Sequence, residues 1–424
     1  MPRAPAVYLL PAFPVLFESF VAGEVLRLAR LGVELRLVVL DRSDTADPKM
    51  LERVGAAGME PLYLMDRPAR LMGWAAAFAA RHPGDAVRAW RVNRQASSFA
   101  AGSRSVRLLK TLATMRLAER EGWHHVHAHW TLPADVGLML ARIRGLRFSF
   151  SAHAVDIYDD PSLTDSALAD WGLPGKIASA DFVATCTGQN REVLSALAPD
   201  GPETVKLIYH GVDLEVFDGA KVEEADTPAI LSVGRLVPKK GFLHLIEACD
   251  ALARDGLRFR CEIVGEGRQR PELEAEIRRR GLEDAVALVG GLPQDEVRDR
   301  LRRATVFVLC PDADAGHYGI PNVLFESLAM RTPAVSRHLP GIEELVSDGE
   351  NGLVVHDPAE LAPAMRRLLE DPELRARLGQ AGRETVERRF DADATAAELR
   401  ALLMPGSQTA PGTDRAPARP SAPR

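Results

Sequence analysis

The sequence contains little cysteine and no long apolar run. Its 424 residues include four cysteines, which are far apart and form no CxxC pair. That spacing excludes a zinc-finger site and a dithiol redox site, and scattered thiols in apolar stretches are typical of buried positions in a reducing cytoplasm. No segment approaches the roughly 18 apolar residues of a membrane-spanning helix. We therefore expect a cytoplasmic protein. The cysteines are Cys186, Cys249, Cys261 and Cys310, and three of them lie in apolar stretches where buried free thiols are common.

The sequence also lacks a strong net charge. The formal charge is -6, so we expect no nucleic-acid partner, and any affinity for anionic lipid must come from a local patch. An apolar run at 7–17 follows Arg3, as in a secretory signal, but prolines and then Glu18 interrupt it. We interpret this run as a first strand and loop.

Short apolar runs alternate with amphipathic stretches along most of the chain. This alternation predicts α/β architecture, with parallel sheets covered by helices on both faces. The polar, acidic segment 211–228 separates two such series and indicates a linker. We predict strands at 6–10, 34–40, 61–65, 125–129, 147–151, 181–185 and 205–209, and then at 229–233, 258–264, 285–289, 305–309, 333–336 and 352–355.

The predicted organisation is two Rossmann-like, doubly wound domains with a cleft between them. The first domain spans 1–210 and the second spans 211–385. A helix at 386–404 is expected to pack back on the first domain. The tail 405–424 has no large apolar side chain, so we expect it to be disordered.

The richest loop follows the first strand of the second domain. Ligands of open parallel sheets bind beyond the carboxyl ends of the strands. Arg235 and Lys240 lie there, at the start of a predicted helix whose free amides attract anions. This arrangement favours a diphosphate site. The alternative, a solvated basic turn, is equally compatible with the residues alone.

Two further loops support a phosphate-binding edge. Gly265 lies in the turn VGEG at 264–267, which alone is a weak signal. Glu326 lies in an apolar helix, where an acid needs a partner or a ligand, and its carboxylate can accept hydrogen bonds from both ribose hydroxyls. The residues that open this helix are Gly319, Ile320, Pro321, Asn322, Val323 and Leu324.

Together these motifs resemble the retaining glycosyltransferases of family 4, which have the GT-B fold. The motifs are GRLVPKKG at 234–241, VGEG at 264–267, GIPNVLFES at 319–327, HGVD at 210–213 with Phe217, and NGLVV at 351–355. The segment FSFSAHAVDIY at 148–158 resembles the acceptor-side histidine segment of the subgroup that builds bacterial exopolysaccharides. The resemblance covers about residues 5 to 400.

The resemblance implies a retaining transfer of a hexosyl unit from a nucleotide-diphosphate sugar to a glycan or lipid-linked acceptor. It implies that Arg235 and Lys240 hold the diphosphate and that Glu326 holds the ribose. It places His153 and Asp156 among the catalytic residues, with no metal and no cofactor. The donor-binding residues that it implies are Arg235, Lys240, Gly265, Tyr318, Gly319, Ile320, Pro321, Asn322, Val323, Leu324 and Glu326.

The sequence departs from the family pattern at Tyr318. The family has two glutamates separated by seven residues, of which the first contacts hydroxyls of the donor sugar. Here the second is Glu326, but Tyr318 stands in the first position. A phenol offers one donor and one acceptor on a rigid ring, so sugar recognition must differ.

Two patterns invite a metal-site interpretation. Asp-Ala-Asp occurs at 312–314 and at 391–393, but acid-x-acid is common in acidic loops. The histidine-rich segment at 124–129 predicts that only His127 and His129 share one strand face, with no third ligand evident. We therefore predict no metal site.

A basic, aromatic segment lies at 67–110. Nine basic residues stand against the single acid Asp85, with aromatic side chains interleaved. Such a segment favours contact with an anionic membrane, at the inner face of the cytoplasmic membrane. The alternative is a solvated helical face whose aromatics lie in the core. The residues are Arg67, Arg70, Arg81, Arg88, Arg91, Arg94, Arg104, Arg107 and Lys110, with Trp74, Phe78, Trp90 and Phe99.

Two other functions remain open from the sequence. One is a GT-B isomerase acting on a nucleotide sugar, which would need a pair of catalytic carboxylates that the sequence does not identify. The other is a nucleotide-sugar-binding protein that has lost turnover. This alternative remains because Tyr318 replaces a glutamate of the family pattern.

Overall fold

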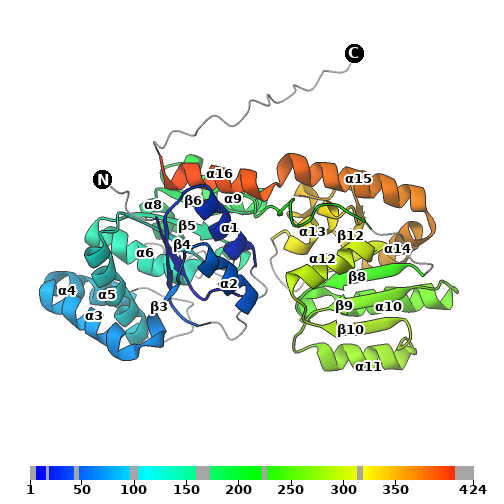
Figure 1. Ribbon diagram of the computed structural model, residues 1–424, viewed down its shortest axis with the longest axis horizontal. Helices are drawn as coiled ribbons and strands as arrows, with labels where there is room; N and C mark the ends of the chain where they lie inside the picture. The colour runs from blue at the N-terminus through cyan, green and yellow to red at the C-terminus, as the bar shows by residue number, and fades with distance from the viewer. Residues whose placement is uncertain are drawn as a thin grey trace, which may run out of the picture.

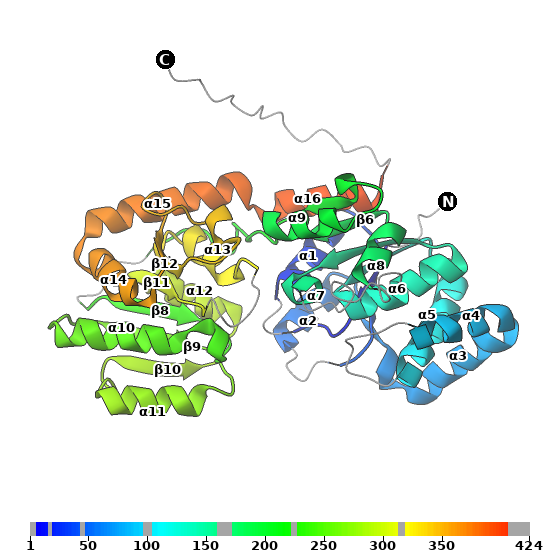
Figure 2. The same cartoon turned by 180° about the vertical axis from the view of Figure 1, so that it is seen from behind.

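The computed structural model describes residues 6–15, 19–42, 47–95, 104–158, 172–221, 227–312 and 319–405. These residues form two domains that lie side by side, each a parallel sheet with helices on both faces (Figures 1 and 2). The predicted fold class is therefore confirmed. The predicted tail at 405–424 lies outside the described residues from 406 onward.

The first domain contains a sheet of seven parallel strands in the order β3-β2-β1-β4-β5-β6-β7. Each predicted strand is present, with small differences at the ends. The predicted strand 61–65 is the shortest of them, because a 3-10 turn begins at Leu64. The strands are β1 Ala6–Leu10, β2 Leu35–Val39, β3 Leu62–Tyr63, β4 His125–His129, β5 Arg147–Ala152, β6 Phe182–Thr185 and β7 Val205–Leu207.

The second domain contains a sheet of six parallel strands in the order β10-β9-β8-β11-β12-β13. The reversal of strand order between β8 and β11 is the switch point at which doubly wound sheets bind ligands. All six predicted strands are present. They are β8 Ala229–Val233, β9 Arg260–Val264, β10 Val286–Gly290, β11 Val306–Leu309, β12 Ala334–Arg337 and β13 Leu353–Val355.

Helices cover both sheets. In the first domain they are α1 Ser19–Arg30, α2 Pro48–Ala56, α3 Pro68–Arg81, α4 Pro83–Gln95, α5 Arg104–Glu121, α6 Thr131–Arg144, α7 Ala154–Tyr158, α8 Leu173–Ser179 and α9 Gly188–Ala196. In the second they are α10 Phe242–Arg254, α11 Arg270–Arg280, α12 Gln294–Arg303, α13 Asn322–Ala329, α14 Leu361–Glu370 and α15 Pro372–Arg389, and α16 Ala392–Leu403 follows. No helix in these ranges is both long enough and apolar enough to cross a bilayer. The four cysteines are buried, and none of them forms a disulfide bond.

The two domains are joined where two chain segments run together. Val212 donates to Phe390 O at 2.8 Å, and Ala392 donates to Val212 O at 3.1 Å. Helix α16 then packs on α1, and Leu399 and Leu403 enter the apolar core behind the first sheet.

Polar contacts fix the same junction. Arg27 of α1 forms ion pairs with Asp213 at 2.6 Å and with Asp393 at 3.0 Å. Asp391 accepts a hydrogen bond from the amide of Asp393 at 2.9 Å, so the second Asp-Ala-Asp pattern is a helix cap. Phe217 is buried in the core of the second domain, so the predicted linker is packed, not extended, over its described part.

Candidate active site

A cavity of about 370 Å³ lies between the two domains. Its walls are formed by residues that follow the carboxyl ends of strands in both sheets, as expected for doubly wound domains. The first domain contributes Phe20, Trp130, His153, Cys186 and His210. The second contributes the loops after β8, β9 and β10 and the start of α13, including Arg235, Lys240, Gly265, Gln294 and Glu326.

The basic loop after β8 forms the floor of this cavity. Lys240 ends a 3-10 turn directly before α10, and its aliphatic stem packs on Gly234. Burial, followed by the nearby charges of Lys239 and Arg235, lowers the pKa of Lys240 to about 8. Neither Arg235 nor Lys240 has an ion-pair partner in the described part of the chain. Two cations without carboxylate partners at the bottom of a cleft favour an anionic ligand.

Gly265 allows the turn after β9 to touch this loop. Its φ is 149°, and a Cβ there would overlap the carbonyl oxygen of Gly234. The contact is fixed by hydrogen bonds from Gly234 N to Val264 O at 2.9 Å and from Gly265 N to Gly290 O at 2.8 Å. Only glycine fits this approach, so Gly265 sets the shape of the floor.

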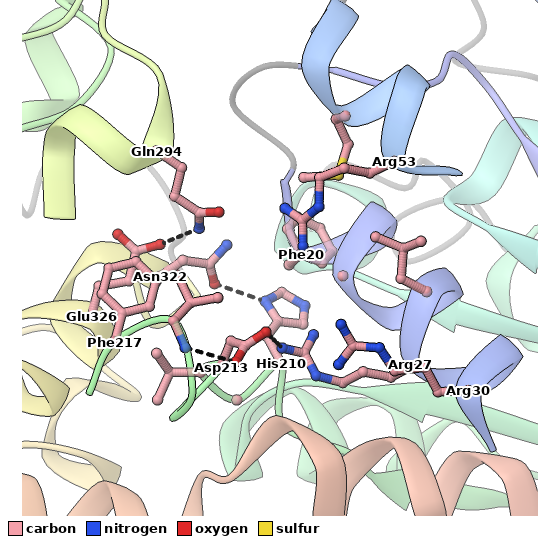
Figure 3. Close-up of a pocket in the computed structure, with 16 residues that line it drawn as sticks. Phe20, Arg27, Arg30, Arg53, His210, Asp213, Phe217, Gln294, Asn322 and Glu326 are labelled. Carbon is pink, nitrogen blue, oxygen red and sulfur yellow. Dashed lines mark hydrogen bonds and ion pairs between the residues drawn. The ribbon is translucent and has the colours of Figure 1, made fainter. Parts of the chain in front are cut away.

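Glu326 faces the same cavity from the second turn of α13. Gln294 Nε2 donates to Glu326 Oε1 at 2.9 Å (Figure 3). Burial raises the pKa of Glu326 to about 7, and the hydrogen bond from Gln294 opposes that shift. The acid therefore has the partner that its apolar surroundings require, and its other oxygen remains available to a ligand hydroxyl.

The raised pKa of Glu326 predicts a pH-dependent stability. A raised folded-state pKa means that protonation stabilises the fold at low pH and that this contribution is lost as pH rises through about 7. Between about pH 5 and pH 8, the free energy of unfolding of the wild type should fall by up to about 3 kcal/mol relative to that of Glu326→Gln. This figure takes about 1.4 kcal/mol per unit of pKa difference between the folded and unfolded states. Urea unfolding of both forms across this range measures the difference. Glu283→Gln, an exposed acid, is the control, and a constant gap between wild type and Glu326→Gln would contradict the assignment.

His153 lies directly after β5 and forms part of the opposite wall. Its ring is surrounded by those of Trp130, His210 and Phe20, at centroid distances of 4.9, 5.3 and 5.5 Å. Burial, followed by the nearby His210 and His129, holds the pKa of His153 well below its usual value. His153 is therefore a neutral imidazole near pH 7.

His210 connects the two walls. Its Nδ1 lies 3.1 Å from Oδ1 of Asn322, an acceptor, so Nδ1 donates and Nε2 carries the lone pair (Figure 3). The ring stacks on Phe20 at a centroid distance of 4.0 Å. Burial lowers the pKa of His210 to about 4. The hydrogen bond to Asn322 fixes both the tautomer and the ring plane.

A smaller pocket of about 60 Å³ adjoins the cavity at the domain junction. It shares His210, Asn322 and Glu326 with the larger cavity, and Arg30 and Arg53 reach it from the first domain (Figure 3). These arginines make the first-domain side of the junction basic, which reinforces the preference for an anionic ligand.

Comparison with known proteins identifies the second domain. The family described as glycosyl transferases group 1 matches residues 215–385, which contain the basic loop, the glycine turn and Glu326. The second domain is similar to this family over these residues, and we call it the group 1 domain.

Similar proteins extend the likeness beyond this domain. Alpha-D-kanosaminyltransferase of Streptomyces kanamyceticus is 29% identical over 64% of this chain and 75% of its own length. The putative colanic acid biosynthesis glycosyltransferase WcaL of Escherichia coli K12 is 36% identical over 48% of this chain and 51% of its own length. The aligned regions thus span about half to three quarters of these relatives.

Solved structures match nearly the whole chain. HepE of Anabaena, solved in complex with UDP, has a TM-score of 0.69 at 16% identity, covering 94% of this chain and 99% of its own. Sucrose-phosphate synthase of Thermosynechococcus elongatus has a TM-score of 0.70 at 20% identity, with 94% and 98% covered. These likenesses confirm the predicted GT-B fold.

The predicted donor residues of the group 1 domain gather at the cavity, with two exceptions. Leu324 is fully buried in the core and its amide donates to Pro321 O, so it supports α13 and does not line the cavity. Tyr318 lies outside the described residues, as does the side chain of Asp156. The other residues of this set line the cavity, and they are Arg235, Lys240, Gly265, Gly319, Ile320, Pro321, Asn322, Val323 and Glu326.

The structure corrects one prediction for the histidine-rich segment at 124–129 of the first domain. His125 shares the face of His127 and His129, because side chains two residues apart in a strand point the same way. His125 Nε2 and His127 Nδ1 both lie 2.8 Å from Ser149 Oγ. The prediction that only His127 and His129 share a face was therefore wrong.

Several cavity residues were not predicted as site residues from the sequence. Phe20, Trp130 and Cys186 come from the first domain, and Gln294 comes from α12 of the group 1 domain. Trp130 and Cys186 each stand directly after a strand, which was the available signal. Trp130 has a φ of 65°, a strained conformation for a bulky residue that is often found at functional sites.

Proposed function

We propose that the protein is a retaining family 4 glycosyltransferase that moves a hexosyl unit from a nucleotide-diphosphate sugar to a glycan or lipid-linked acceptor in cell-surface polysaccharide synthesis. The observation that carries the proposal is the shared cavity that holds Arg235, Lys240 and Glu326. The names of WcaL and of the lipopolysaccharide core biosynthesis glycosyltransferase LpsE of Rhizobium meliloti support the polysaccharide context. The complex of HepE with UDP-glucose supports the donor class.

The second domain has the charges that departure of a nucleoside diphosphate requires. As the bond from sugar to phosphate breaks, negative charge builds on the leaving phosphate. Arg235, Lys240 and the amides at the start of α13 would stabilise that charge as it develops. Side-chain cations then do the work that a divalent metal does in other transferases, so we propose that turnover needs no metal.

The first domain would place the sugar and the acceptor. His153 lies on the wall opposite the basic loop, and its neutral ring can exchange a hydrogen bond with a sugar hydroxyl. A contact that strengthens as the anomeric carbon gains positive character would accelerate transfer. The acceptor would enter along the first-domain wall.

The test is a panel of nucleotides followed by a panel of nucleotide sugars, each with excess chelator. The matching nucleoside diphosphate should raise the melting temperature, since a ligand at 100 times its Kd stabilises by about 2.7 kcal/mol. The matching sugar donor should then yield a glycosylated acceptor. Stabilisation without any product would favour a binding protein, and conversion of the donor without an acceptor would favour an isomerase. A strict metal requirement would contradict the proposed phosphate site.

Donor selectivity provides a further prediction, at Tyr318. Losing one hydrogen bond from the phenol should cost about 0.5 to 1.5 kcal/mol, so Tyr318→Phe should lower kcat/KM severalfold with the true donor and much less with others. Tyr318→Glu restores the family residue and should shift the preference. If Tyr318→Phe is silent with every donor while Tyr318→Glu creates a new activity, the position marks a lost site.

The basic segment 67–110 is proposed as a membrane contact. Helices α3 and α4 form the end of the first domain farthest from the second domain (Figures 1 and 2). Met72, Val87 and Trp90 are exposed there, at 54%, 47% and 46%. Arg107 and Lys110 are buried and bonded to Asn93 and Asp41, so they do not belong to this surface.

The remaining cations of the segment should determine its binding to anionic membranes. Arg88, Arg91 and Arg94 are exposed along α4. Their joint replacement by glutamate should abolish binding to anionic vesicles, which in the wild type should weaken as salt shortens the screening length below roughly 8 Å. Vesicle co-sedimentation measures the effect. The control is the same change at Arg258, Arg268 and Arg278, exposed residues of the second domain, and equal binding by both triple variants would contradict the proposal.

A further inference from the structure

Three adjacent strands of the first sheet bring metal-ligating side chains together at the cleft. In the order β5-β6-β7, Ala152 pairs with Thr185 and Thr185 pairs with Leu207. The chain then continues into His153, Cys186 and His210, each just beyond the carboxyl end of its strand. Their ligand atoms all lie within 4.8 Å of one another.

From this geometry we infer that His153, Cys186 and His210 form an inhibitory binding site for Zn²⁺ at the sugar end of the cleft. The inference rests on the proposed function for its inhibitory consequence, whereas the binding itself does not. Two imidazoles and one thiol are the ligand types that Zn²⁺ prefers. A thiol in the set also disfavours Mg²⁺ and Mn²⁺, which select oxygen ligands.

His210 is oriented as a ligand. Its Nδ1 donates to Oδ1 of Asn322, which leaves the lone pair on Nε2. That atom is buried and has no hydrogen-bond partner in the described part of the chain. A histidine ligand usually donates its other ring N–H to an oxygen in this way, which fixes the tautomer and the ring plane.

The site also has room for the ion. All three residues line the cavity, so a fourth coordination position faces open space, as in zinc sites that exchange a ligand. Ligand atoms around tetrahedral zinc lie roughly 3.3 to 3.8 Å apart, given bonds of about 2.0 to 2.3 Å. Modest side-chain rotation therefore closes the set. Binding converts the Cys186 thiol to a thiolate and releases one proton to solvent.

A second group, Glu24, His127 and His129, meets the same distance criterion but does not suit an ion. Both ring nitrogens of His127 already bond to serine hydroxyls, at 2.8 Å to Ser149 and 3.1 Å to Ser151. His129 Nε2 bonds to Glu24 at 3.1 Å. This second group is a hydrogen-bonded network inside the first domain.

An ion at the inferred site would compete with the donor sugar. Cys186 Sγ faces Gly319 of the second domain, 3.8 Å from where a Cβ of Gly319 would lie. The ion would hold His153 and occupy the space in front of it, while the basic loop that would bind the diphosphate stays free. Zn²⁺ should therefore block transfer without displacing a nucleoside diphosphate.

The experiment titrates the protein with Zn²⁺ against a chromophoric chelator and, separately, with Co²⁺ as a spectroscopic probe. The wild type should bind one equivalent of Zn²⁺ and show a thiolate-to-cobalt absorption band. Cys186→Ala should lose the band and bind Zn²⁺ at least about tenfold more weakly. Cys249→Ser, which removes a buried thiol of the second domain, should behave as the wild type, and Mg²⁺ should not compete.

The overturning result is equal Zn²⁺ affinity of the wild type and Cys186→Ala, or a cobalt spectrum without a thiolate band. Cys186→Ser replaces the alanine variant if the latter loses its folded circular-dichroism spectrum. A kinetic arm compares each protein with its own rate in chelator and should show inhibition by Zn²⁺ only where the site is intact. Zinc binding without transfer from any donor would defeat the proposed function and leave the site standing, whereas transfer without zinc binding would do the reverse.

Discussion

Replacing Lys240 by alanine is expected to lower kcat by about a thousandfold. The ammonium lies at the floor of the cleft without a carboxylate partner in the described residues, so its charge is available to the leaving diphosphate. Removing one preorganised donor from developing negative charge costs about 10² to 10³ in kcat, and a full positive charge belongs at the upper end. Steady-state kinetics with the donor found in the nucleotide-sugar panel measure the loss. Lys206→Ala, in the first domain outside the cavity, is the control, and a loss below about tenfold would contradict the role.

The same residue gives the nucleotide affinity a pH dependence. Because the pKa of Lys240 is lowered to about 8, the cation is present below that pH and is lost as pH rises through it. Nucleoside diphosphate affinity should therefore fall above about pH 8. A bound anion favours the charged form of Lys240, so at high ligand concentration the fall in affinity should begin at a somewhat higher pH. The fall should be absent in Lys240→Ala.

Replacing His153 by alanine is expected to lower turnover by about a hundredfold or more, with nucleotide affinity nearly unchanged. The ring lies on the first-domain wall, across the cavity from the loop that would hold the nucleotide, so it would act mainly in the transition state. Calorimetric titration with the nucleoside diphosphate, together with single-turnover kinetics, separates the two effects. His124→Ala, at an exposed position before β4, is the control. Equal losses in nucleotide affinity and in turnover would refute the role of His153.

The sheets could be predicted from the sequence because parallel strands that are buried on both faces consist of continuous apolar runs. Strands β1, β4 and β8 have the predicted bounds. The end of a strand is less well determined. The run 258–264 begins pairing only at Arg260, although Phe259 is already buried, since burial starts before the hydrogen-bonded ladder does.

The second-domain half of the site was predictable for a similar reason. Arg235, Gly265 and Glu326 lie in short loops and at a helix start that directly follow strands, so their meeting point follows from sheet topology. The partner of Glu326 was not predictable. Gln294 begins α12, and only packing of α12 against α13 brings the amide to the carboxylate.

Burial of charge was the least predictable feature. The sequence predicts Arg107 and Lys110 as part of a basic face, but both side chains are buried. Arg107 forms an ion pair with Asp135, 28 residues away in the chain, and Lys110 forms one with Asp41, 69 residues away. Long-range partners of this kind depend on tertiary packing and leave no local pattern. The count of cations in 67–110 therefore overstates the charge that reaches the surface.

The proposed reaction is a retaining transfer at the cleft between the two domains. Proton NMR of the anomeric centre of the product, recorded early in turnover with the donor found in the panel and with excess chelator, distinguishes retention from inversion. The product should have the anomeric configuration of the donor, and its signal should disappear in the Lys240→Ala control. A product of inverted configuration would contradict the proposed reaction.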